Sequence, residues 1–561
     1  MARLHLHHDV DAAGLAALRR PRDDVVREKP AADGGAPGGE LADGAADVER
    51  FAPAAGPFSR YTRTLQARPS GDDGRWTVDE RIVFRLAVPF WSPLLVLPVK
   101  RALRRPRYDG RQPWWAPPGR LDAEEARTLS LLAILALVYA YLGTLLSQTL
   151  TYAAESFDAG TRAQGALLAA VRVGVLATLV AAAAADRVGR RRLVRGCLTA
   201  ACLVMSTAAL APGLWWFGGA QTLSRGLTTA TEVIVLILAA EELPARSRAW
   251  GVSVLTLAAG LGSGMVVWHL PLVGLGPQAW RLLYLPPLAF CVVVAWAARR
   301  LPESRRFRAA AAATGTAHLP KVTWREIDRH IRRRLALLGG SAVLLLCFSS
   351  PVSQFGNHFL RTERAMSPEL ITVFTLVTST PAAVGVYLGG RLCETWGRRR
   401  VGALGIAGGT IFAVFSYQTF GWALWATSLG TTVLAGMTLP AMRVYQPELF
   451  PTQLRGLANG LIVLTGVIGT VVGVLAVGAL SELWGSLSWP ITLLSVAPLA
   501  VALLVLTVYP ETANRELEEL NPDDAGAAGI PQAAAAASGL ATGAAAGPPT
   551  PAPVGERPSA E

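Results

Sequence analysis

The sequence has little charge and very little lysine for its length. Charged residues make up 17% of its 561 residues, and lysine occurs only at Lys29, Lys100 and Lys321. Soluble domains carry roughly 25% charged residues, so this composition does not favour a soluble globular protein. The basic residues are mostly arginines in short loops between apolar segments. This distribution argues against a continuous phosphate-binding face, and we predict no nucleic-acid partner.

Cysteines are few and are not spaced as metal or disulfide sites. The five are Cys197, Cys202, Cys291, Cys347 and Cys393, with no CxxC and no Cys/His pairing. This spacing argues against a disulfide framework and against zinc. The N-terminal MARLHLHHDVDAAG lacks the apolar core and cleavage site of a signal peptide, and we interpret its histidines as solvated. We therefore predict no metal and no cofactor.

The apolar segments also lack the motifs of an enzyme. They contain no paired carboxylates, no GxSxG and no phosphate-binding G-x-x-x-x-G-K-[ST]. A membrane enzyme would need such a catalytic set. We predict that the chain is not an enzyme.

Long apolar segments dominate the sequence. Hydrophobic residues make up 52% of the chain, and the mean hydropathy is +0.36. Apolar runs of about 20 residues are long enough to cross a bilayer, and only helices or closed barrels satisfy the backbone there. The runs show no strand alternation, so they predict twelve transmembrane helices. These are 128–150, 162–184, 193–211, 214–240, 249–268, 281–299, 335–357, 369–390, 401–420, 422–446, 456–479 and 486–508.

The remaining segments are polar or basic. Residues 1–80 are rich in Ala, Gly, Asp and Arg, and we predict a disordered cytoplasmic region. Residues 81–127 contain a short apolar run with prolines and flanking basic residues, which suits an anionic membrane surface, or a linker packed on the bundle. We expect bundles at 128–300 and 335–510, a basic cytoplasmic linker at 301–334, and a mostly disordered cytoplasmic tail at 511–561.

Arginine counts predict the orientation of the chain. Arginine clusters follow the second, fourth, sixth, eighth and tenth apolar segments, whereas the loops after the third and ninth contain none. Because cytoplasmic loops are enriched in Lys and Arg, these clusters predict that both termini are cytoplasmic.

Charged loops recur in the two halves at a nearly constant offset. ADRVGRRRL and CETWGRRRV share an acid, a glycine and arginines, and their acids, Asp186 and Glu394, lie 208 positions apart. An E-x-x-P-x-x-x-R pattern begins at Glu241 and again at Glu448, and a Pro-Glu pair recurs at a similar spacing. This agreement predicts two structurally similar halves.

Glycines in two apolar segments recur at almost the same offset. Gly260 and Gly264 match Gly469 and Gly473. Each pair has small-xxx-small spacing, which predicts a face for close helix packing.

Together these motifs resemble the major facilitator superfamily over residues 128–520. The sequence from Pro510 to Glu519, PET-x-x-x-x-LEE, is most similar to the sugar-porter and metabolite–proton symporter branches. The resemblance implies an all-α membrane protein with twelve transmembrane helices in two pseudo-symmetric six-helix bundles. It further implies a transporter that alternates between two states.

The recurring charges predict a cytoplasmic gate network. A lone arginine is usually a topology anchor, but an anchor needs neither a matching acid nor a glycine. We expect the glycines to allow tight turns and the arginines to reach neighbouring acids. In the family, similar networks join the two bundles while the transporter faces outward. The predicted gate network comprises Asp186, Gly189, Arg190, Arg191, Glu241, Arg248, Glu303, Glu394, Gly397, Arg398, Arg399, Glu448, Arg455 and Glu511.

Ionisable residues at bilayer depth predict a substrate and proton pathway. Arg172, Arg225 and Glu232 lie inside predicted spans, where charge is costly and usually functional. Glu232 follows Arg225 by seven residues, about 10 Å along one helix face. We expect Arg225 to bind a substrate anion or a proton-linked acid, and a structural charge pair is the alternative. The polar candidates in the pathway are Gln148, Gln354 and Asn357.

The motifs specify the coupling ion and the substrate less closely than they specify the fold. The first span lacks the acid of proton-coupled sugar porters until Glu155 and Asp158 at its outer end, so Glu232 is the best-placed proton acceptor. The seventh and tenth spans depart from the sugar-binding pattern of the family. The arginines instead favour a carboxylate or another anionic metabolite.

We therefore predict a monomeric secondary active transporter that moves a small metabolite by alternating access. We expect it to work by proton-coupled symport in a bacterial plasma membrane. The alternatives are efflux by proton antiport, facilitated uniport, and a non-transporting sensor on the same scaffold. The bacterial assignment follows from the preference for Arg, Ala and Gly, which is typical of high-GC genomes.

Overall fold

The N-terminal region of this computed structural model folds into an antiparallel sheet. The structure describes residues 1–31, 47–70, 75–159, 189–305 and 328–521, together with the single residues 167, 170, 171, 174, 178, 184 and 308. The sheet order is β1-β5-β4-β3-β2. Its strands are β1 (Ala2–Val10), β2 (Arg27–Pro30), β3 (Asp47–Ala55), β4 (Phe58–Ser70) and β5 (Arg75–Leu86).

Two helices pack on this sheet. The short helix α1 (Ala12–Leu18) places Leu15 and Leu18 against one apolar cluster of the sheet. The helix α2 (Ser92–Leu103) places Val99 and Leu103 against another. Both helices bury only one side, as amphipathic helices on a sheet do.

The sheet corrects the prediction that residues 1–80 are disordered. Alternate residues of β4 are buried, but one of them is Arg63, which pairs with Glu80 and Glu28 at 2.5 and 3.1 Å with no exposed surface. Tyr61 donates a hydrogen bond to Glu28 over 2.6 Å. A composition scan counts these residues as polar and therefore misses a core that is partly ionic. Residues 32–46 and 71–74 lie outside the described part of the chain.

The histidines of β1 take part in this arrangement rather than being solvated as a group. His8 Nε2 lies 2.9 Å from Glu80 Oε2, and His7 contacts Asp79. Burial alone would raise the pKa of Glu80, but the hydrogen bond from His8 and the charge of Arg63 outweigh it. The pKa of Glu80 consequently lies below its ordinary value of 4.5.

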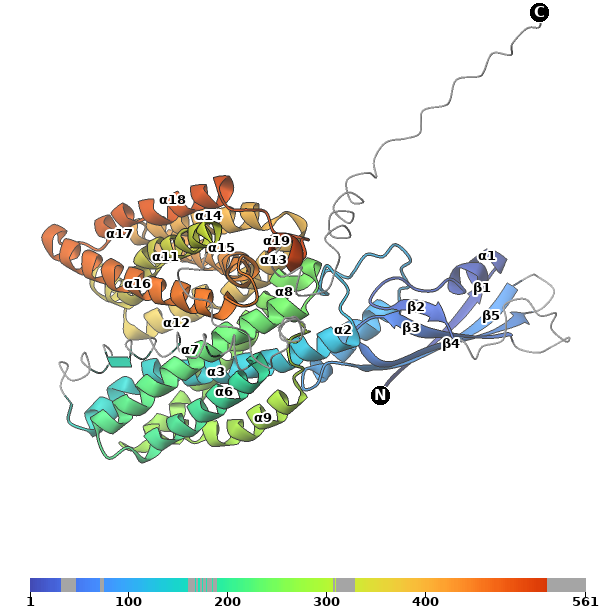
Figure 1. Ribbon diagram of the computed structural model, residues 1–561, viewed down its shortest axis with the longest axis horizontal. Helices are drawn as coiled ribbons and strands as arrows, with labels where there is room; N and C mark the ends of the chain where they lie inside the picture. The colour runs from blue at the N-terminus through green and yellow to red at the C-terminus, as the bar shows by residue number, and fades with distance from the viewer. Residues whose placement is uncertain are drawn as a thin grey trace, which may run out of the picture.

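The rest of the described chain is helical and forms two bundles side by side (Figure 1). The first contains α3 (Ala123–Ser156), α6 (Arg190–Thr207), α7 (Leu214–Glu242), α8 (Arg248–His269) and α9 (Pro286–Arg300). The second contains α11 (Arg329–Thr362), α12 (Pro368–Ser379), α13 (Ala382–Thr395), α14 (Arg398–Gln418), α15 (Gly421–Glu448), α16 (Arg455–Trp484), α17 (Ser488–Leu494) and α18 (Val496–Thr507).

Ten stretches of the described helices are long and apolar enough to span a membrane. They fall on ten of the twelve predicted segments. The helix α15, 28 residues long, occupies an eleventh, although its polar residues keep it out of those ten. The predicted segment 162–184 lies almost wholly outside the described residues. The helical membrane architecture is confirmed, and the count of twelve stays a prediction.

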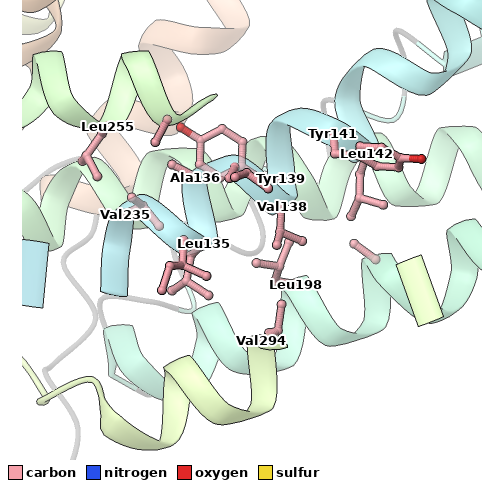
Figure 2. Close-up of a cluster of buried hydrophobic side chains, with 14 of the residues drawn as sticks. Leu135, Ala136, Val138, Tyr139, Tyr141, Leu142, Leu198, Val235, Leu255 and Val294 are labelled. Carbon is pink, nitrogen blue, oxygen red and sulfur yellow. The ribbon is translucent and has the colours of Figure 1, made fainter. Parts of the chain in front are cut away.

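The core of the first bundle surrounds α3. Leu135 and Val138 of α3 face Leu198 of α6 and Val294 of α9 in Figure 2. All four side chains are buried. This packing fixes α3 among its neighbours within the bundle.

Close helix packing through glycine differs between the halves. A Cβ at Gly469 or Gly473 would lie 2.2 or 2.0 Å from a backbone oxygen of α11, so these glycines allow close contact as predicted. Gly260 and Gly264 have no such neighbour among the described residues, and their predicted role is wrong. Gly262 takes it instead, because its Cβ would lie 2.0 Å from the carbonyl oxygen of Leu137.

The first residues of the C-terminal tail pack against the second bundle, which is compatible with the prediction of a tail that is mostly disordered. The short helix α19 (Leu517–Leu520) buries both of its leucines, and Asn521 donates a hydrogen bond to the carbonyl of Glu448 over 2.8 Å. Residues 522–561, and most of the predicted linker 301–334, lie outside the described residues.

Candidate functional site

Two equivalent glycines begin the recurring charged loops. Gly189 and Gly397 precede α6 and α14 with φ values of 104° and 94°. L side chains rarely adopt this conformation, whereas glycine does so without a steric cost. A Cβ at Gly397 would also lie 2.6 Å from Glu511 Oε2. The glycines therefore permit the turns that bring the two loops beside Glu303 and Glu511, the equivalent acids of their own halves.

Those acids bind the start of the helix rather than an arginine side chain. Glu303 Oε1 accepts hydrogen bonds from the backbone amides of Arg190 and Arg191 at 3.0 and 3.2 Å. Glu511 accepts equivalent bonds from the amides of Arg398 and Arg399, also at 3.0 and 3.2 Å. A carboxylate placed there satisfies free amides and complements the helix dipole.

The first arginine of each loop reaches the acid at the end of a neighbouring helix. Arg190 Nη2 lies 3.4 Å from Glu241 at the end of α7, and Arg398 donates to Glu448 at the end of α15. Arg190 also donates to the carbonyl of Thr452, in the other half, over 2.8 Å. The repeat thus produces the same ionic contact twice.

The second arginines do not pair with acids as predicted. Arg191 donates to the carbonyls of Ala298 and Arg299, and Arg399 donates to the carbonyl of Leu506. These contacts stay within one half. Asp186, the remaining acid of the predicted gate network, lies outside the described residues.

The E-x-x-P-x-x-x-R motifs exchange partners between the halves. Arg455 of the second half donates to Glu241 of the first over 2.5 Å. Arg248 of the first half lies 3.6 Å from Glu448 of the second. All four side chains have at most 1% of their surface exposed. Sequence spacing predicted these residues, but it did not predict that the two motifs bind each other.

Glu394 adds another contact between the halves. It accepts a hydrogen bond from the backbone amide of Ala249, at the start of α8, over 2.6 Å. It also lies 3.5 Å from Arg398 in its own half. Glu394 therefore caps the start of a helix in the opposite bundle.

A segment of residues 113–119, hereafter the strap, crosses the same end of both bundles. Gly119 exchanges two hydrogen bonds with Ser247 of the first half, at 3.1 and 2.7 Å. Tyr387 of the second half donates to the carbonyl of Trp114 over 2.7 Å. The next residue, Arg120, donates to Asp23 beside the sheet over 2.6 Å. The sheet domain is therefore tied to both halves at the gate network.

A cavity of about 620 Å³, a size typical of small-molecule sites, lies between the halves. It is lined by α3, α7 and α8 of the first half and by α11, α15 and α16 of the second. Arg225 and Glu232 line it from α7, and Arg443 lines it from α15. Two of the three predicted pathway charges therefore share this cavity, whereas Arg172 lies outside the described residues.

The charges in the cavity are unequally paired. Arg443 Nη1 lies 2.7 Å from Glu232 Oε1, which joins the two halves. Arg225 donates only to the carbonyl of Gly143, over 3.2 Å, and among the described residues it meets no carboxylate. The cavity thus contains one guanidinium whose charge is balanced and another whose charge is not.

Hydroxyl groups also recur in equivalent places. Thr144 and Ser263 of the first half are 2.9 Å apart, and Ser350 and Thr470 of the second half are 3.0 Å apart. All but Ser350 line the cavity. The repeat offset could have identified these residues, because they match at 206 and 207 positions.

The predicted polar residues of the pathway lie elsewhere. Gln148, Gln354 and Asn357 do not line this cavity, and Gln354 and Asn357 are exposed. They sit beyond the cavity toward the ends of α3 and α11 that are remote from the sheet. The geometry does not bring them together with Arg225.

Comparison with known proteins gives a consistent result. Residues 341–550 match the model of the Major Facilitator Superfamily. The structure of the proton:xylose symporter XylE, bound to 6-bromo-6-deoxy-D-glucose, is similar with a TM-score of 0.57 and 16% identity, covering 70% of this chain and 98% of that one. No curated protein matches the sequence.

Two further solved structures share the fold. The human organic anion transporter MFSD10 (TETRAN) has a TM-score of 0.54 and 16% identity, covering 68% of this chain and 99% of that one. A variant of the E. coli fucose:proton symporter FucP has a TM-score of 0.54 and 13% identity, covering 68% of this chain and 98% of that one. At these identities the likeness concerns the fold alone.

Proposed function

We propose that this chain, whose residues 341–550 match the model of the Major Facilitator Superfamily, is a member of that superfamily and a secondary active transporter that moves a small metabolite by alternating access. It is a multi-pass membrane protein. The observation that carries the proposal is a cavity between two bundles whose ionic contacts close one end of the molecule. Such contacts can bias an equilibrium between two states of a transporter.

The closed end is the cytoplasmic end in this proposal. The gate network lies in the Arg-rich loops, which the positive-inside rule assigns to the cytoplasm together with both termini. Glu232 lies nine residues before Glu241, or about 14 Å deeper along α7, and Arg443 contacts it from α15. The contacts between the halves therefore extend from the cytoplasmic surface to the floor of the cavity, as in an outward-facing transporter of a bacterial plasma membrane.

The substrate is an anion, most simply a carboxylate. Arg225 points its unbalanced charge into the cavity, and a guanidinium binds a carboxylate through two parallel hydrogen bonds. The hydroxyls of Thr144 and Ser263 offer neutral hydrogen bonds beside it. Among the described residues that line the cavity, the carboxylate available to a cation is Glu232, and it is already paired with Arg443.

Proton coupling runs through Glu232. Protonation of its carboxylate removes the charge that holds Arg443, so a proton taken up from outside weakens the contact between the halves. Loss of that proton to the cytoplasm restores the pair. Symport therefore needs no acid in the first span, whose residues Glu155 and Asp158 are not among those lining the cavity.

Uptake by proteoliposomes tests the proposal. The purified chain is reconstituted and offered a panel of radiolabelled carboxylates, sugars and amines. We expect uptake of a carboxylate that falls at least about tenfold in Arg225→Gln, since a lost charge-assisted bond is worth about 1.5–3 kcal/mol. Arg192→Gln, an exposed arginine of α6, is the matched control.

The outcomes separate the alternatives. Uptake that a protonophore abolishes supports symport, whereas uptake unaffected by it indicates a uniporter. Transport of sugars or amines with equal rates in Arg225→Gln would contradict the anionic substrate. A chain that binds ligand without moving any substrate would be a sensor, and the proposal of transport would be wrong.

A further inference from the structure

A second cavity, of 460 Å³, lies where the sheet domain meets the bundles. Its walls come from α2, the strap and the first turns of α3 and α8, and Tyr387 closes it from the second half. The lining is almost wholly apolar and includes Leu95, Ala133, Val254 and Leu257. The cavity is separate from the central one and shares no residue with it.

The depth of this cavity matches one leaflet of a bilayer. Along α8 its lining extends from Trp250 to Leu261, and α8 begins at Arg248. With a rise of 1.5 Å per residue, these eleven steps cover about 16 Å. Half of a hydrocarbon core measures about 15 Å. The cavity therefore runs along the helices through the depth of the leaflet nearest the sheet domain.

The helix α2 starts at the surface of that leaflet. Ser130 of α3 donates a hydrogen bond to the carbonyl of Pro89 over 2.6 Å, and Trp91 donates to the carbonyl of Ser130 over 3.2 Å. Ser130 lies just after the point where α3 changes from charged residues to an apolar run. These two bonds fix the start of α2 at the level where the bilayer is expected to begin.

The exposed side of α2 changes from apolar to basic along its axis. Phe90, Leu94 and Leu97 are 68, 70 and 59% exposed at the end beside Ser130. Arg101, Arg104 and Arg105 are exposed at the other end, and in the described part of the chain they form no ion pair. Residues 90–111 contain six basic residues and one acid. This order, apolar side chains at hydrocarbon depth and then cations, suits the interface of an anionic membrane.

We propose that this second cavity binds one acyl chain of an anionic phospholipid of the cytoplasmic leaflet, whose phosphate is bound by the arginines of α2. The apolar lining contacts the acyl chain of the lipid. Leu94, which both lines the cavity and is exposed, marks where this acyl chain enters. The free arginines select an anionic headgroup over a zwitterionic one. A soluble apolar ligand would not require a cation cluster beside the entrance.

The occupant would touch both halves of the molecule. Trp250 and Val254 belong to the first half, and Tyr387 belongs to the second, where it also binds the strap. The bound lipid therefore stabilises the arrangement in which these residues meet. The inference rests on the proposed orientation, but it is tested by lipid retention, which does not depend on transport.

Native mass spectrometry of the full chain in mild detergent tests this site. The protein is titrated with phosphatidylglycerol and with phosphatidylcholine of the same acyl chains. We expect one retained phosphatidylglycerol per chain, held at least tenfold more tightly than phosphatidylcholine. Leu257→Trp, which fills the cavity, is expected to weaken this binding at least tenfold. Replacement of Arg101, Arg104 and Arg105 by Gln is expected to remove the preference between the two lipids.

Matched controls make each outcome decisive. The same charge change at the exposed residues Arg60, Arg81 and Arg85 of the sheet should leave retention unchanged. Thermal unfolding shows which variants are folded, and the triple arginine variant still tests the site if Leu257→Trp is not. Retention of phosphatidylglycerol that no cavity or arginine variant alters would overturn the proposal. So would equal binding of the two lipids by the unaltered chain, or a co-purified apolar compound that displaces lipid.

Discussion

Arg455 of the second half binds Glu241 of the first, and Arg248 of the first lies beside Glu448 of the second. The two pairs are equivalent under the repeat. The E-x-x-P-x-x-x-R motif of each half therefore contributes both a glutamate and an arginine to the contacts between the halves. All four groups are buried, and each loses its partner or becomes hydrated if the halves separate at this end. We therefore propose that the gate network is a two-state element rather than a set of topology anchors.

Arg190→Ala is predicted to favour the state that is open to the cytoplasm. Arg190 contacts Glu241 and the carbonyl of Thr452, and loss of a buried charged partner costs about 2 kcal/mol or more. Ser253 is buried between α8 and α13, and a Cβ at Gly390 would lie 1.7 Å from its hydroxyl. Thiol labelling of Ser253→Cys, in a background without native cysteines, should therefore become faster, and uptake should fall.

Arg191→Ala is the control for this change. Arg191 lies in the same loop, but its side chain donates only to carbonyls of its own half. Labelling that rises equally in both variants would indicate local unfolding of the loop instead of a change in state.

Glu511→Ala is predicted to destabilise the second bundle. Glu511 accepts two backbone hydrogen bonds at the start of α14, and loss of a helix N-cap costs about 0.5–2 kcal/mol. The midpoint of thermal unfolding in detergent should fall. Glu482→Ala, at an exposed glutamate of α16, should leave it unchanged. An equal fall in both variants would remove the capping role assigned to Glu511.

Exchange of the charges of Glu232 and Arg443 is predicted to restore part of what each single change removes. Arg443→Glu alone leaves two acids together, and Glu232→Arg alone leaves two arginines. Each should lower uptake about tenfold or more, since coupling between close charges is about 1.5–7 kcal/mol. The double variant should recover uptake relative to either. Additive losses would show that the 2.7 Å contact does not matter for transport.

Glu232→Gln is predicted to separate transport from coupling. The amide cannot carry the proton, so exchange of labelled for unlabelled substrate should continue while accumulation against a gradient is lost. Accumulation that persists and still responds to a protonophore would place the coupling acid elsewhere.

The sheet domain is predicted to lose stability in acid. The pKa of Glu80 lies below its ordinary value of 4.5 in the folded chain, so the unfolded chain binds the proton more readily. The stabilisation is therefore complete above about pH 4.5 and is lost as the pH falls below it. The protection factors of the β4 and β5 amides against hydrogen exchange, which correct for the intrinsic pH dependence of exchange, should fall between pH 5 and pH 3, about the range over which such a carboxylate titrates. Glu80→Gln should reduce this dependence, and an unchanged dependence would contradict the role of Glu80.

The sequence predicted the membrane helices and the members of the gate network because both depend on local spacing. Apolar length identifies a span, and the offset of 207–208 residues pairs each charge with its equivalent. It could not predict that Arg455 meets Glu241 while Arg398 meets Glu448. Two equivalent acids stand at equivalent positions, and only the packing of the bundles decides which arginine each one meets.

The sheet domain was missed because its core is partly ionic. Arg63, Glu28 and Glu80 occupy buried positions of the strands, so the alternation of hydrophobic residues is broken where the sheet is most buried. Their charges compensate only when distant strands come together. Local composition cannot register such compensation, and it therefore indicated disorder.

The cavity was predicted only in part for a similar reason. Arg225 and Glu232 were found because charge inside an apolar span is conspicuous. The partner of Glu232 lies 211 residues further along the chain. Gln354 and Asn357 are as polar as the hydroxyls that line the cavity, and sequence alone could not place them outside it.

The most direct test of the account measures the distance between the two halves at the gate network. Spin labels at Arg192 and Arg400, exposed and equivalent under the repeat, report that distance by double electron–electron resonance in lipid. We predict one dominant short distance in the unaltered chain. In Glu241→Gln and Arg455→Gln a longer distance should become more populated than in the unaltered chain, and substrate should change the ratio of the two distances. A single distance that neither variant nor substrate changes would contradict alternating access through this gate network.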